Sequence, residues 1–235
     1  MFKNITTELE SYSEPERVEK LKKYLQVFPG GYGEGDEFIG VRNPNLRTVS
    51  KKYYKPITLN DLSKLLSSNI HEYRLTGVFI LVLKFEKEKS ESIRKELVDF
   101  YVDHLEFMNN WDLIDSSAHK ILGVYLLDKD TKMLYDFAYS DNLWLQRVSI
   151  ISTFHFIRNL QFKDTFEISK ILLHHEHDLI HKAVGWMIRE VGNRDFDKAF
   201  EFVKYHYADM PRTMLRYAIE KYPEKTRQDF LKGRI

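Results

Sequence analysis

The segment that decides the fold class is Asp-Asn-Leu-Trp-Leu-Gln-Arg-Val-Ser-Ile-Ile, residues 141–151, because its pattern recurs elsewhere in the chain. Residues 69–78, 177–186 and 210–219 follow the same arrangement of polar and apolar positions. The apolar residues recur at the three- and four-residue steps of a helix, and strand alternation is hard to find. A helical repeat of roughly 35 to 45 residues is typical of stacked helix pairs. We therefore predict a single all-α domain, residues 1–235, built as a right-handed solenoid of HEAT-like helix pairs.

One basic position recurs in these four segments. It is occupied by Arg74, Arg147, Lys182 and Arg216, at intervals of 73, 35 and 34 residues. Equivalent positions of a solenoid align, so we expect these side chains to form a basic row on the concave face. Such a row suits a polyanion, whose charges recur along an axis. The alternative is that the four residues merely solvate a helix face.

The composition limits the kinds of binding surface and chemical site that this chain can have. The chain has 36 Lys and Arg against 35 Asp and Glu, for a formal net charge of +1. A surface for nucleic acid therefore requires that basic residues gather on one face. The absence of cysteine excludes disulfides, thiol nucleophiles and cysteine-ligated metal sites. The sequence shows no signal peptide and no apolar run long enough for a membrane span, so we expect a soluble, cytoplasmic protein. We also expect it to be a monomer.

The repeat near residues 109–126 carries an acid where the others carry a base. Trp111 and Asp115 are four residues apart, so a helix places them on one face. In one interpretation, Asp115 pairs with a base of a neighbouring repeat, such as Arg147, and locks the repeats together. In the other, it is an anion in a basic groove that stabilises a developing cation or orients a water. The residues alone leave both interpretations open.

Three tryptophans fall near the start or middle of repeat helices, at positions 111, 144 and 186. Each belongs either to the core or to a surface that offers its ring to a sugar, a base or a cation. Thr58 and Asp178 are expected to be helix N-caps. Asp112 is expected to be a first-turn acid that complements the helix dipole.

Two other features have ordinary explanations. The glycine-rich stretch 30–40 lacks the Lys-Ser/Thr pair of a phosphate-binding loop, so we expect a surface loop between helices, with a lid as the less favoured alternative. A histidine cluster lacks any metalloprotease signature, so we expect a solvated turn and no metal: His174, His175, His177 and His181.

Three blocks in order carry a family resemblance: Asn-Trp-Asp-Leu-Ile-Asp at 110–115, Asp-Asn-Leu-Trp-Leu-Gln-Arg at 141–147, and Lys-Ala-Val-Gly-Trp-Met-Ile-Arg-Glu at 182–190. With them, nearly the whole chain resembles the AlkD-type DNA alkylation repair glycosylases, a family of HEAT-like repeats. The family removes N3- and N7-alkylated purines from double-stranded DNA. The positive charge on such a base already weakens its glycosidic bond.

The resemblance implies roles for particular residues. Asp115 would be the catalytic carboxylate that stabilises an oxocarbenium-like sugar and positions the water. Trp111 and Trp186 would pack against the backbone around the lesion, and Arg147 would hold a phosphate. Tyr24 and Arg189 would be further contacts in the groove. The damaged base would not be flipped into a pocket, and no cofactor is implied.

Two departures from the family pattern concern the same region. Asn110 stands where well-known members have a second Trp, and the stretch 30–40 is longer than in those members. Some relatives of this fold bind DNA with little or no glycosylase activity. The alternative function is therefore a non-catalytic scaffold that holds a DNA structure or a protein in its concave face.

Overall fold

The computed structural model describes all 235 residues and is all-α, which confirms the predicted fold class. Its α-helices are numbered α1 to α15, and its one β-type contact is an isolated bridge between Glu37 and Ile70. No helix is long and apolar enough to cross a membrane. The chain divides into two compact units, Met1–Ile121 and Leu122–Ile235, which are described in turn.

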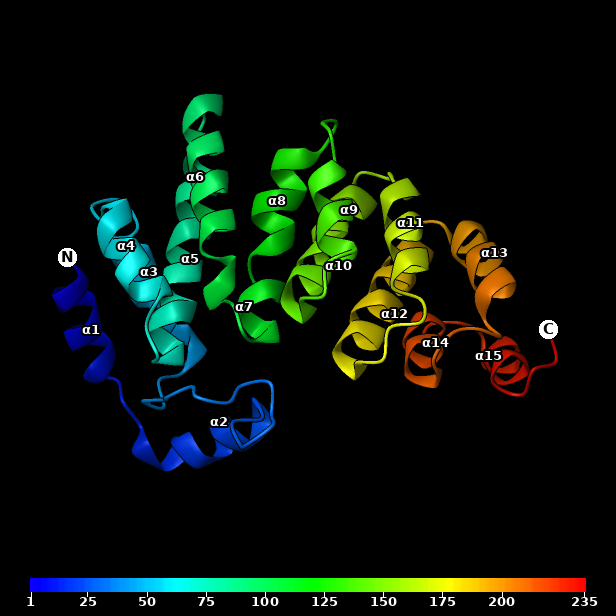
Figure 1. Cartoon of the computed structure of the whole chain (residues 1–235), viewed down its shortest axis with the longest axis horizontal. Helices are drawn as coiled ribbons and strands as arrows, with labels where there is room; N and C mark the ends of the chain where they lie inside the picture. The colour runs from blue at the N-terminus through cyan, green and yellow to red at the C-terminus, as the bar shows by residue number, and fades with distance from the viewer. The chain divides into compact units, whose positions relative to one another are not determined.

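The N-terminal unit is organised around α5, which is buried along most of its length. Helices α3, α4, α6 and α7 all pack against α5 (Figure 1). Two 3-10 turns, Pro15–Arg17 and Leu105–Phe107, precede α2 and α7. The helices of this unit are α1 (Phe2–Glu10), α2 (Val18–Tyr24), α3 (Asn43–Tyr53), α4 (Leu59–Leu66), α5 (His71–Lys87), α6 (Glu91–Asp103) and α7 (Trp111–Asp115), and α8 (Ala118–Leu126) spans the division between the units.

The C-terminal unit is a stack of helix pairs. Helices α10, α12 and α14 pack in sequence as one layer, while α11 contacts both α9 and α12. Gly185 allows α12 and α14 to approach closely, because a Cβ there would lie 2.5 Å from the carbonyl oxygen of Met214. The helices are α9 (Lys132–Ala138), α10 (Leu143–Arg158), α11 (Lys163–Ile171), α12 (Asp178–Gly192), α13 (Phe196–His206), α14 (Arg212–Ala218) and α15 (Glu224–Leu231).

The four segments with matching sequence each contain the start of a helix: α5, α10, α12 and α14. Side-chain caps fix several of these starts. Asn142 accepts hydrogen bonds from the backbone N–H groups of Trp144 and Leu145, and Thr58 caps α4 as predicted. The prediction for Asp178 is wrong by one residue, because His177 is the cap and its Nδ1 accepts the N–H of Leu179.

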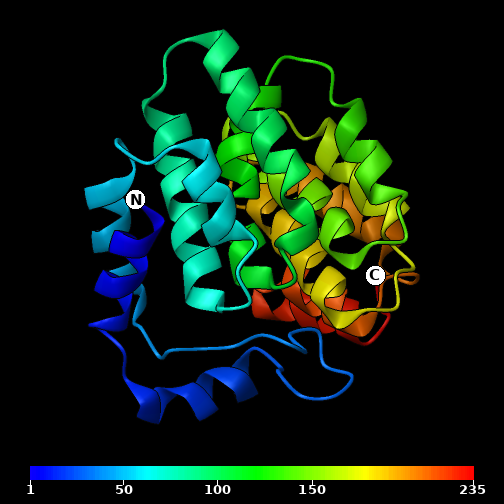
Figure 2. The same ribbon diagram turned by 60° about the vertical axis from the view of Figure 1, so that its left-hand side comes forward.

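The glycine-rich segment crosses the N-terminal end of α5 (Figures 1 and 2). The N–H of Glu37 donates to the carbonyl of Asn69, and the N–H of His71 donates to the carbonyl of Glu37. Gly40 has a φ of +82°, and a Cβ there would lie 2.1 Å from the Glu14 carbonyl oxygen. The segment does join two helices, α2 and α3, as expected. It differs from a simple surface loop because Asp36 and Phe38 are buried.

Candidate active site

A cavity of about 600 Å³ in the N-terminal unit is lined by three of the residues that the resemblance assigns to the site. Tyr24, Trp111 and Asp115 all line it. Apolar side chains from the surrounding helices and from the glycine-rich segment form much of the remaining wall: Leu21, Leu25, Phe38, Val41, Leu46 and Leu75. His71, Glu72 and Asp112 add polar groups to the same wall. The cavity therefore combines aromatic rings with several carboxyl groups.

Helix α7 supplies two of these residues from its two ends. It is only five residues long, and the side chain of Asn110 caps it by accepting the backbone N–H of Trp111 at 2.9 Å. Asn110 is fully buried, and its Nδ2 donates to the carbonyl of Leu25 at 3.4 Å. This residue thus joins the start of α7 to the end of α2.

The aromatic pair at the cavity comes from two different helices. The rings of Tyr24 and Trp111 meet edge to face, with centroids 5.6 Å apart and planes at 82°. Tyr24 is 65% exposed, whereas Trp111 is half-buried. Both rings are available to pack against a flat or sugar-like group at the mouth of the cavity.

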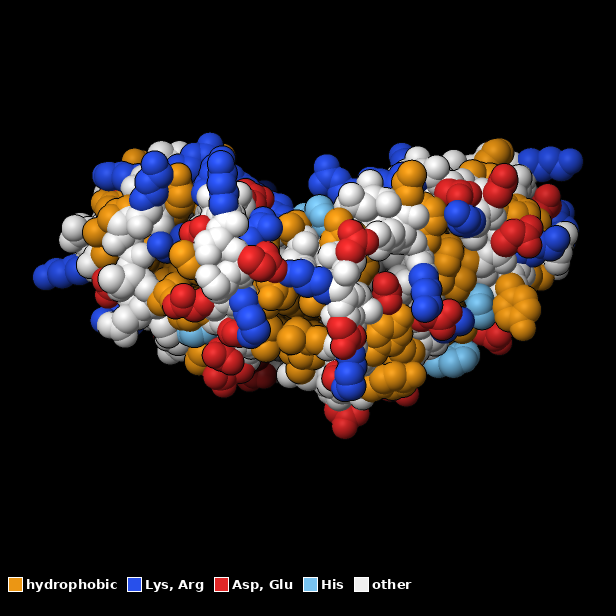
Figure 3. All heavy atoms as spheres, turned by 90° about the horizontal axis from the view of Figure 1, so that it is seen from above, with side chains coloured by type: hydrophobic (Ala, Val, Ile, Leu, Met, Phe, Trp, Pro, Cys, Tyr) orange, Lys and Arg blue, Asp and Glu red, His pale blue; other side chains and the backbone are white.

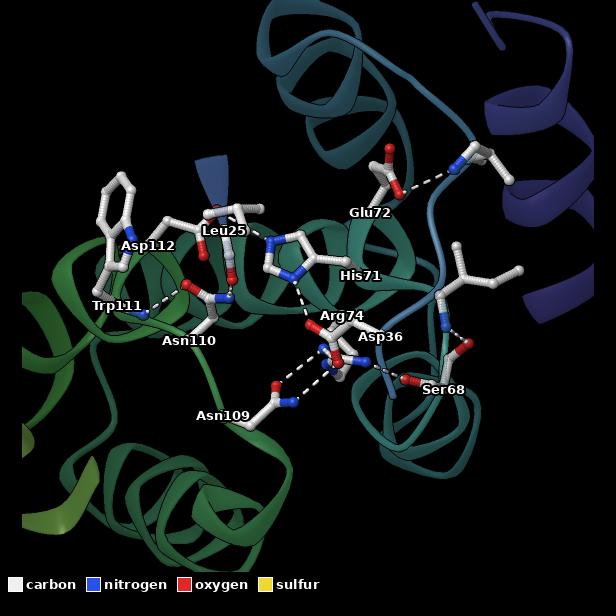
Figure 4. A network of polar contacts seen from close by, with 12 residues as sticks. Leu25, Asp36, Ser68, His71, Glu72, Arg74, Asn109, Asn110, Trp111 and Asp112 are labelled. Atoms are coloured by element: carbon white, nitrogen blue, oxygen red, sulfur yellow. Dashed lines mark hydrogen bonds and ion pairs between the residues drawn. The ribbon is translucent and has the colours of Figure 1, made fainter. Parts of the chain in front are cut away.

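A network of charged groups includes two residues of this wall, His71 and Asp112 (Figure 4). The His71 Nδ1 is 3.2 Å from Asp36 Oδ2, and its Nε2 is 2.9 Å from Asp112 Oδ2. The Asp36 carboxylate also receives Arg74 Nη2 at 2.7 Å and Asn109 Nδ2 at 2.8 Å. Arg74 continues to the Ser68 carbonyl, to which its Nη1 donates at 2.6 Å. The network joins the glycine-rich segment, α5 and α7.

Burial and neighbouring charges set the protonation of this network. Burial alone lowers the pKa of His71, but the Asp112 and Asp36 carboxylates outweigh it and raise the pKa from 6.5 to about 9. Burial likewise acts to raise the pKa of Asp36, yet His71, Arg74 and Asn109 together hold it below its ordinary value. The raised pKa of His71 and the lowered pKa of Asp36 both favour an imidazolium beside an ionised Asp36 carboxylate.

A second buried carboxyl group fixes the glycine-rich segment to α5. Glu72 accepts the N–H of Gly40 at 2.8 Å and that of Ile39 at 3.2 Å. Burial raises the pKa of Glu72 above its ordinary value. This residue faces the same cavity as Asp115, so the wall carries carboxyl groups in three different environments.

Two members of the predicted basic row are not exposed. Arg74 is 4% exposed and Arg147 is 5% exposed. The Arg147 Nη1 donates to the carbonyl of Leu179, at the start of α12, at 2.6 Å. A buried guanidinium needs such partners to offset its desolvation. The expectation of four solvent-facing cations is therefore wrong for these two residues, whose charged groups serve contacts inside the protein.

The other predicted contacts of the C-terminal unit lie on α12 and α14. Trp186 is half-buried, donates its indole N–H to Glu190 at 3.2 Å, and packs 5.8 Å from the Phe154 ring. Arg189 is paired with Glu220, and Lys182 with Asp178 at 2.5 Å. Arg216 is exposed. On the face shown in Figure 3, positive and negative side chains are interspersed over each unit.

Comparison with known proteins places these observations in a family. The family profile described as "DNA alkylation repair enzyme" matches residues 5–222. The chain belongs to this family. A solved structure described as a "Predicted DNA alkylation repair enzyme from Enterococcus faecalis" shares the fold with a TM-score of 0.70 and 16% identity, covering 90% of this chain and 97% of that chain. No curated protein matches the sequence.

The family resemblance drew attention to Trp111 and Asp115 but not to the network behind them. Asp36 lies in a glycine-rich stretch without a motif, and Asp112 was explained by its place in the first turn of α7, which the structure confirms. His71 belongs to a repeat helix in which a role was predicted for Arg74 and not for His71. The sequence did contain a sign of this network: His71, Glu72 and Arg74 are ionisable residues at the start of an otherwise apolar helix. Buried charges require partners, so such a group indicates polar contacts with other segments.

The histidine cluster caps and braces a turn of this family member. His175 Nε2 lies 2.8 Å from the Gln146 side-chain oxygen, and its Nδ1 accepts the N–H of His177. His181 Nε2 contacts the His175 carbonyl. The structure contains no group of three or more His, Cys, Asp or Glu side chains that could hold a metal ion. The ring nitrogens of His175 instead make hydrogen bonds within the unit.

Proposed function

We propose that this member of the DNA alkylation repair family is a DNA glycosylase that excises positively charged N3- and N7-alkylated purines from duplex DNA without base flipping. One observation carries the proposal: Asp115, Trp111 and Tyr24 line one cavity of the N-terminal unit. A carboxylate beside two aromatic rings is suited to a sugar that becomes cationic as its base departs.

The reaction requires little from the enzyme beyond electrostatic stabilisation of the cationic sugar. The bond between the sugar C1′ and the base nitrogen breaks, and its electron pair neutralises the positive charge of the departing base. No general acid is needed, because the leaving group is already activated. A water then forms the new C1′–O bond and gives up a proton. In this proposal Asp115 stabilises the cationic sugar and positions that water.

The remaining predicted residues hold the DNA. Trp111, Trp186 and Tyr24 pack against the backbone near the lesion, while Lys182, Arg189 and Arg216 serve phosphates. Arg189 and Lys182 each have an acidic partner, so a phosphate at either position would compete with a carboxylate. Recognition through the backbone alone predicts little preference for sequence. The proposed enzyme acts as a monomer without a cofactor.

The decisive variant is Asp115→Asn, which keeps the shape and hydrogen-bonding capacity of the side chain and removes its charge. We expect release of 7-methylguanine from methylated duplex DNA to fall about a hundredfold or more, the scale found when one electrostatic stabiliser is lost. DNA affinity should be unchanged or tighter, because a negative charge facing phosphates is removed. The control is Asp136→Asn, which neutralises an exposed carboxylate paired with Lys132 at 2.6 Å.

The opposite outcome is equally specific. If Asp115 is a structural ion-pair partner, its replacement leaves a cation without its counter-charge and lowers the melting temperature markedly. Excision would then decrease only in proportion to the folded fraction. Measuring melting temperature, DNA affinity and base release on this one variant separates the two roles.

A non-catalytic scaffold is the second candidate, and the interior positions of Arg74 and Arg147 favour it. These burials reduce the number of cations available to DNA, and Asn110 replaces a family tryptophan. A pure DNA-binding protein would retard DNA in a gel and release no base. A protein-binding scaffold would do neither.

A further inference from the structure

We propose that His71 is a positioning residue for α7: as a cation it holds Asp36 of the glycine-rich segment with one ring nitrogen and Asp112 of α7 with the other, and so fixes Trp111 and Asp115 at the cavity. The effect on excision rests on the proposed function. The structural part of the proposal, that the charge of His71 sets the place of α7, stands separately and is tested separately.

The geometry suits a doubly protonated ring. Both partners of His71 are carboxylates, at 3.2 Å for Asp36 and 2.9 Å for Asp112. An ionised carboxylate only accepts hydrogen bonds, so each ring nitrogen must carry a proton to donate. Arg74 and Asn109 also donate to Asp36 and keep that carboxylate ionised. A neutral imidazole could serve only one of the two sides.

The surroundings of His71 screen a charge on its ring only weakly. The His71 side chain is 3% exposed, and the Phe38 ring stacks on it with centroids 5.0 Å apart. The charged groups facing the ring are Asp36 from the glycine-rich segment, Asp112 from α7, and Glu72 and Arg74 from α5 itself. Little water reaches this cluster, so the loss of one proton is poorly screened.

Helix α7 depends on such external anchors. A helix of five residues has few internal hydrogen bonds and is not stable alone. Besides the burial of Leu113 and Ile114, its polar anchors are the Asn110 cap at its start and the Asp112–His71 contact in its first turn. Asp112 lies between Trp111 and Asp115 in this helix. A change at His71 therefore moves both cavity residues together, although His71 is linked to α7 only through Asp112.

The first test uses His71→Gln, which is neutral and cannot donate to both carboxylates in the same geometry. We expect kcat for 7-methylguanine release to fall about 10- to 100-fold with little change in DNA affinity, since small misplacements of reacting groups cost this much. The wild-type kcat should decline as the pH rises through about 9, where His71 loses its second proton. That alkaline decline should be absent in the variant.

The matched control is His104→Gln. His104 lies in the same unit, and both of its ring nitrogens contact hydrogen-bond partners, Ser63 and the Phe100 carbonyl, each at 2.7 Å. It does not line the cavity. Asp112→Asn, which keeps an acceptor for the His71 N–H, should retain more activity than His71→Gln. Wild-type kcat and an unchanged pH profile in His71→Gln, or an equal loss in His104→Gln, would overturn the proposal.

The second test needs neither catalysis nor a variant that folds. The ring signals of His71 and the indole N–H signal of Trp111 are followed by NMR in the wild-type chain between pH 6 and about 10. We expect both to change with one shared midpoint near pH 9. The positioning role is refuted if the His71 ring signals titrate with a midpoint near pH 6.5, or if the Trp111 signal does not change as His71 titrates. A wild type that releases no base refutes the proposed function alone, and this titration then decides the role of His71.

Discussion

The same recurring position is used differently in the two units. In the C-terminal unit, Arg147 reaches forward from α10 to the backbone carbonyl of Leu179, 32 residues ahead, where α12 begins. In the N-terminal unit, Arg74 reaches forward from α5 to the side chain of Asn109, 35 residues ahead, just before α7. Arg74 also pairs with the buried carboxylate of Asp36.

In both units, the recurring arginine connects one repeat to the next. The span of one repeat separates donor and acceptor in both units, so the period visible in the sequence has a structural cause. The difference arises from the glycine-rich segment, which brings Asp36 beside the arginine. There the connection becomes part of a charged network that reaches the candidate active site.

The largest effect should come from breaking this network at Arg74. Arg74→Met leaves the buried Asp36 carboxylate with less positive charge around it, and we expect a loss of about 3 kcal/mol in the free energy of unfolding. The double variant Asp36→Asn/Arg74→Met removes the stranded charge and should recover part of this loss. Urea unfolding followed by circular dichroism measures both. Equal stability of the single and double variants would show that the ion pair does not set the cost.

The pH dependence of stability tests the same network without breaking it. The folded-state pKa of His71 is raised from 6.5 to about 9, so its contribution is fully present below pH 6.5 and is lost as the pH rises through 9. The shift corresponds to a decrease of about 3 kcal/mol across this window. In His71→Gln this decrease should be missing. Unfolding midpoints in urea at several pH values provide the measurement, and parallel curves for the two proteins would contradict it.

Two helical glycines offer a smaller contrast between the units. At Gly185, a new Cβ would meet the Met214 carbonyl oxygen at 2.5 Å, and backbone cannot easily give way. At Gly77, it would meet side-chain atoms alone, the Leu66 Cδ2 at 2.9 Å and the Leu65 Cβ at 3.2 Å. We expect Gly185→Ala to cost about 2 kcal/mol and Gly77→Ala to cost less, because helix propensity offsets part of its milder crowding. Similar thermal stability of the two variants would count against this packing argument.

The smallest change in stability is expected at the exposed member of the row. Arg216→Ala should alter the free energy of unfolding by less than about 0.5 kcal/mol. If Arg216 contacts a phosphate, the slope of log affinity against log salt should decrease by about one. Lys204→Ala, on α13, is the control because Lys204 is also exposed. An identical salt slope for wild type and Arg216→Ala removes Arg216 from the proposed DNA-binding surface.

The fold class could be predicted from the helical periodicity of apolar residues, because this periodicity depends only on local spacing in the sequence. The four matching segments mark helix starts at α5, α10, α12 and α14, and Thr58 caps α4 as its hydroxyl predicted. The prediction at Asp178 failed by one position because a histidine ring nitrogen can also accept an N–H, a capping role not expected from the residue type.

The site was less accessible to sequence reasoning because burial is a property of the whole fold. An arginine that solvates a helix face and one that crosses between repeats have the same spacing, so Arg74 and Arg147 could not be separated from Lys182 and Arg216. The Asp36–His71–Asp112 chain joins positions 35 and 41 residues apart, with no local pattern to connect them. The four-residue spacing of Trp111 and Asp115 was visible in the sequence, but their proposed roles come from the family resemblance.

The hydrogen bonds of Asn109 and Asn110, just before α7, close longer chain loops than the bonds from Glu72 that fix the glycine-rich segment to α5. The Asn109–Asp36 and Asn110–Leu25 hydrogen bonds close chain loops of 73 and 85 residues, whereas the Arg147–Leu179 bond of the C-terminal unit closes one of 32. Longer loops lose more chain entropy on closure and form more slowly. During synthesis, the segment cannot complete these contacts until residues 109–112 have left the ribosome. The cavity wall is thus assembled only after most of its own unit has been made.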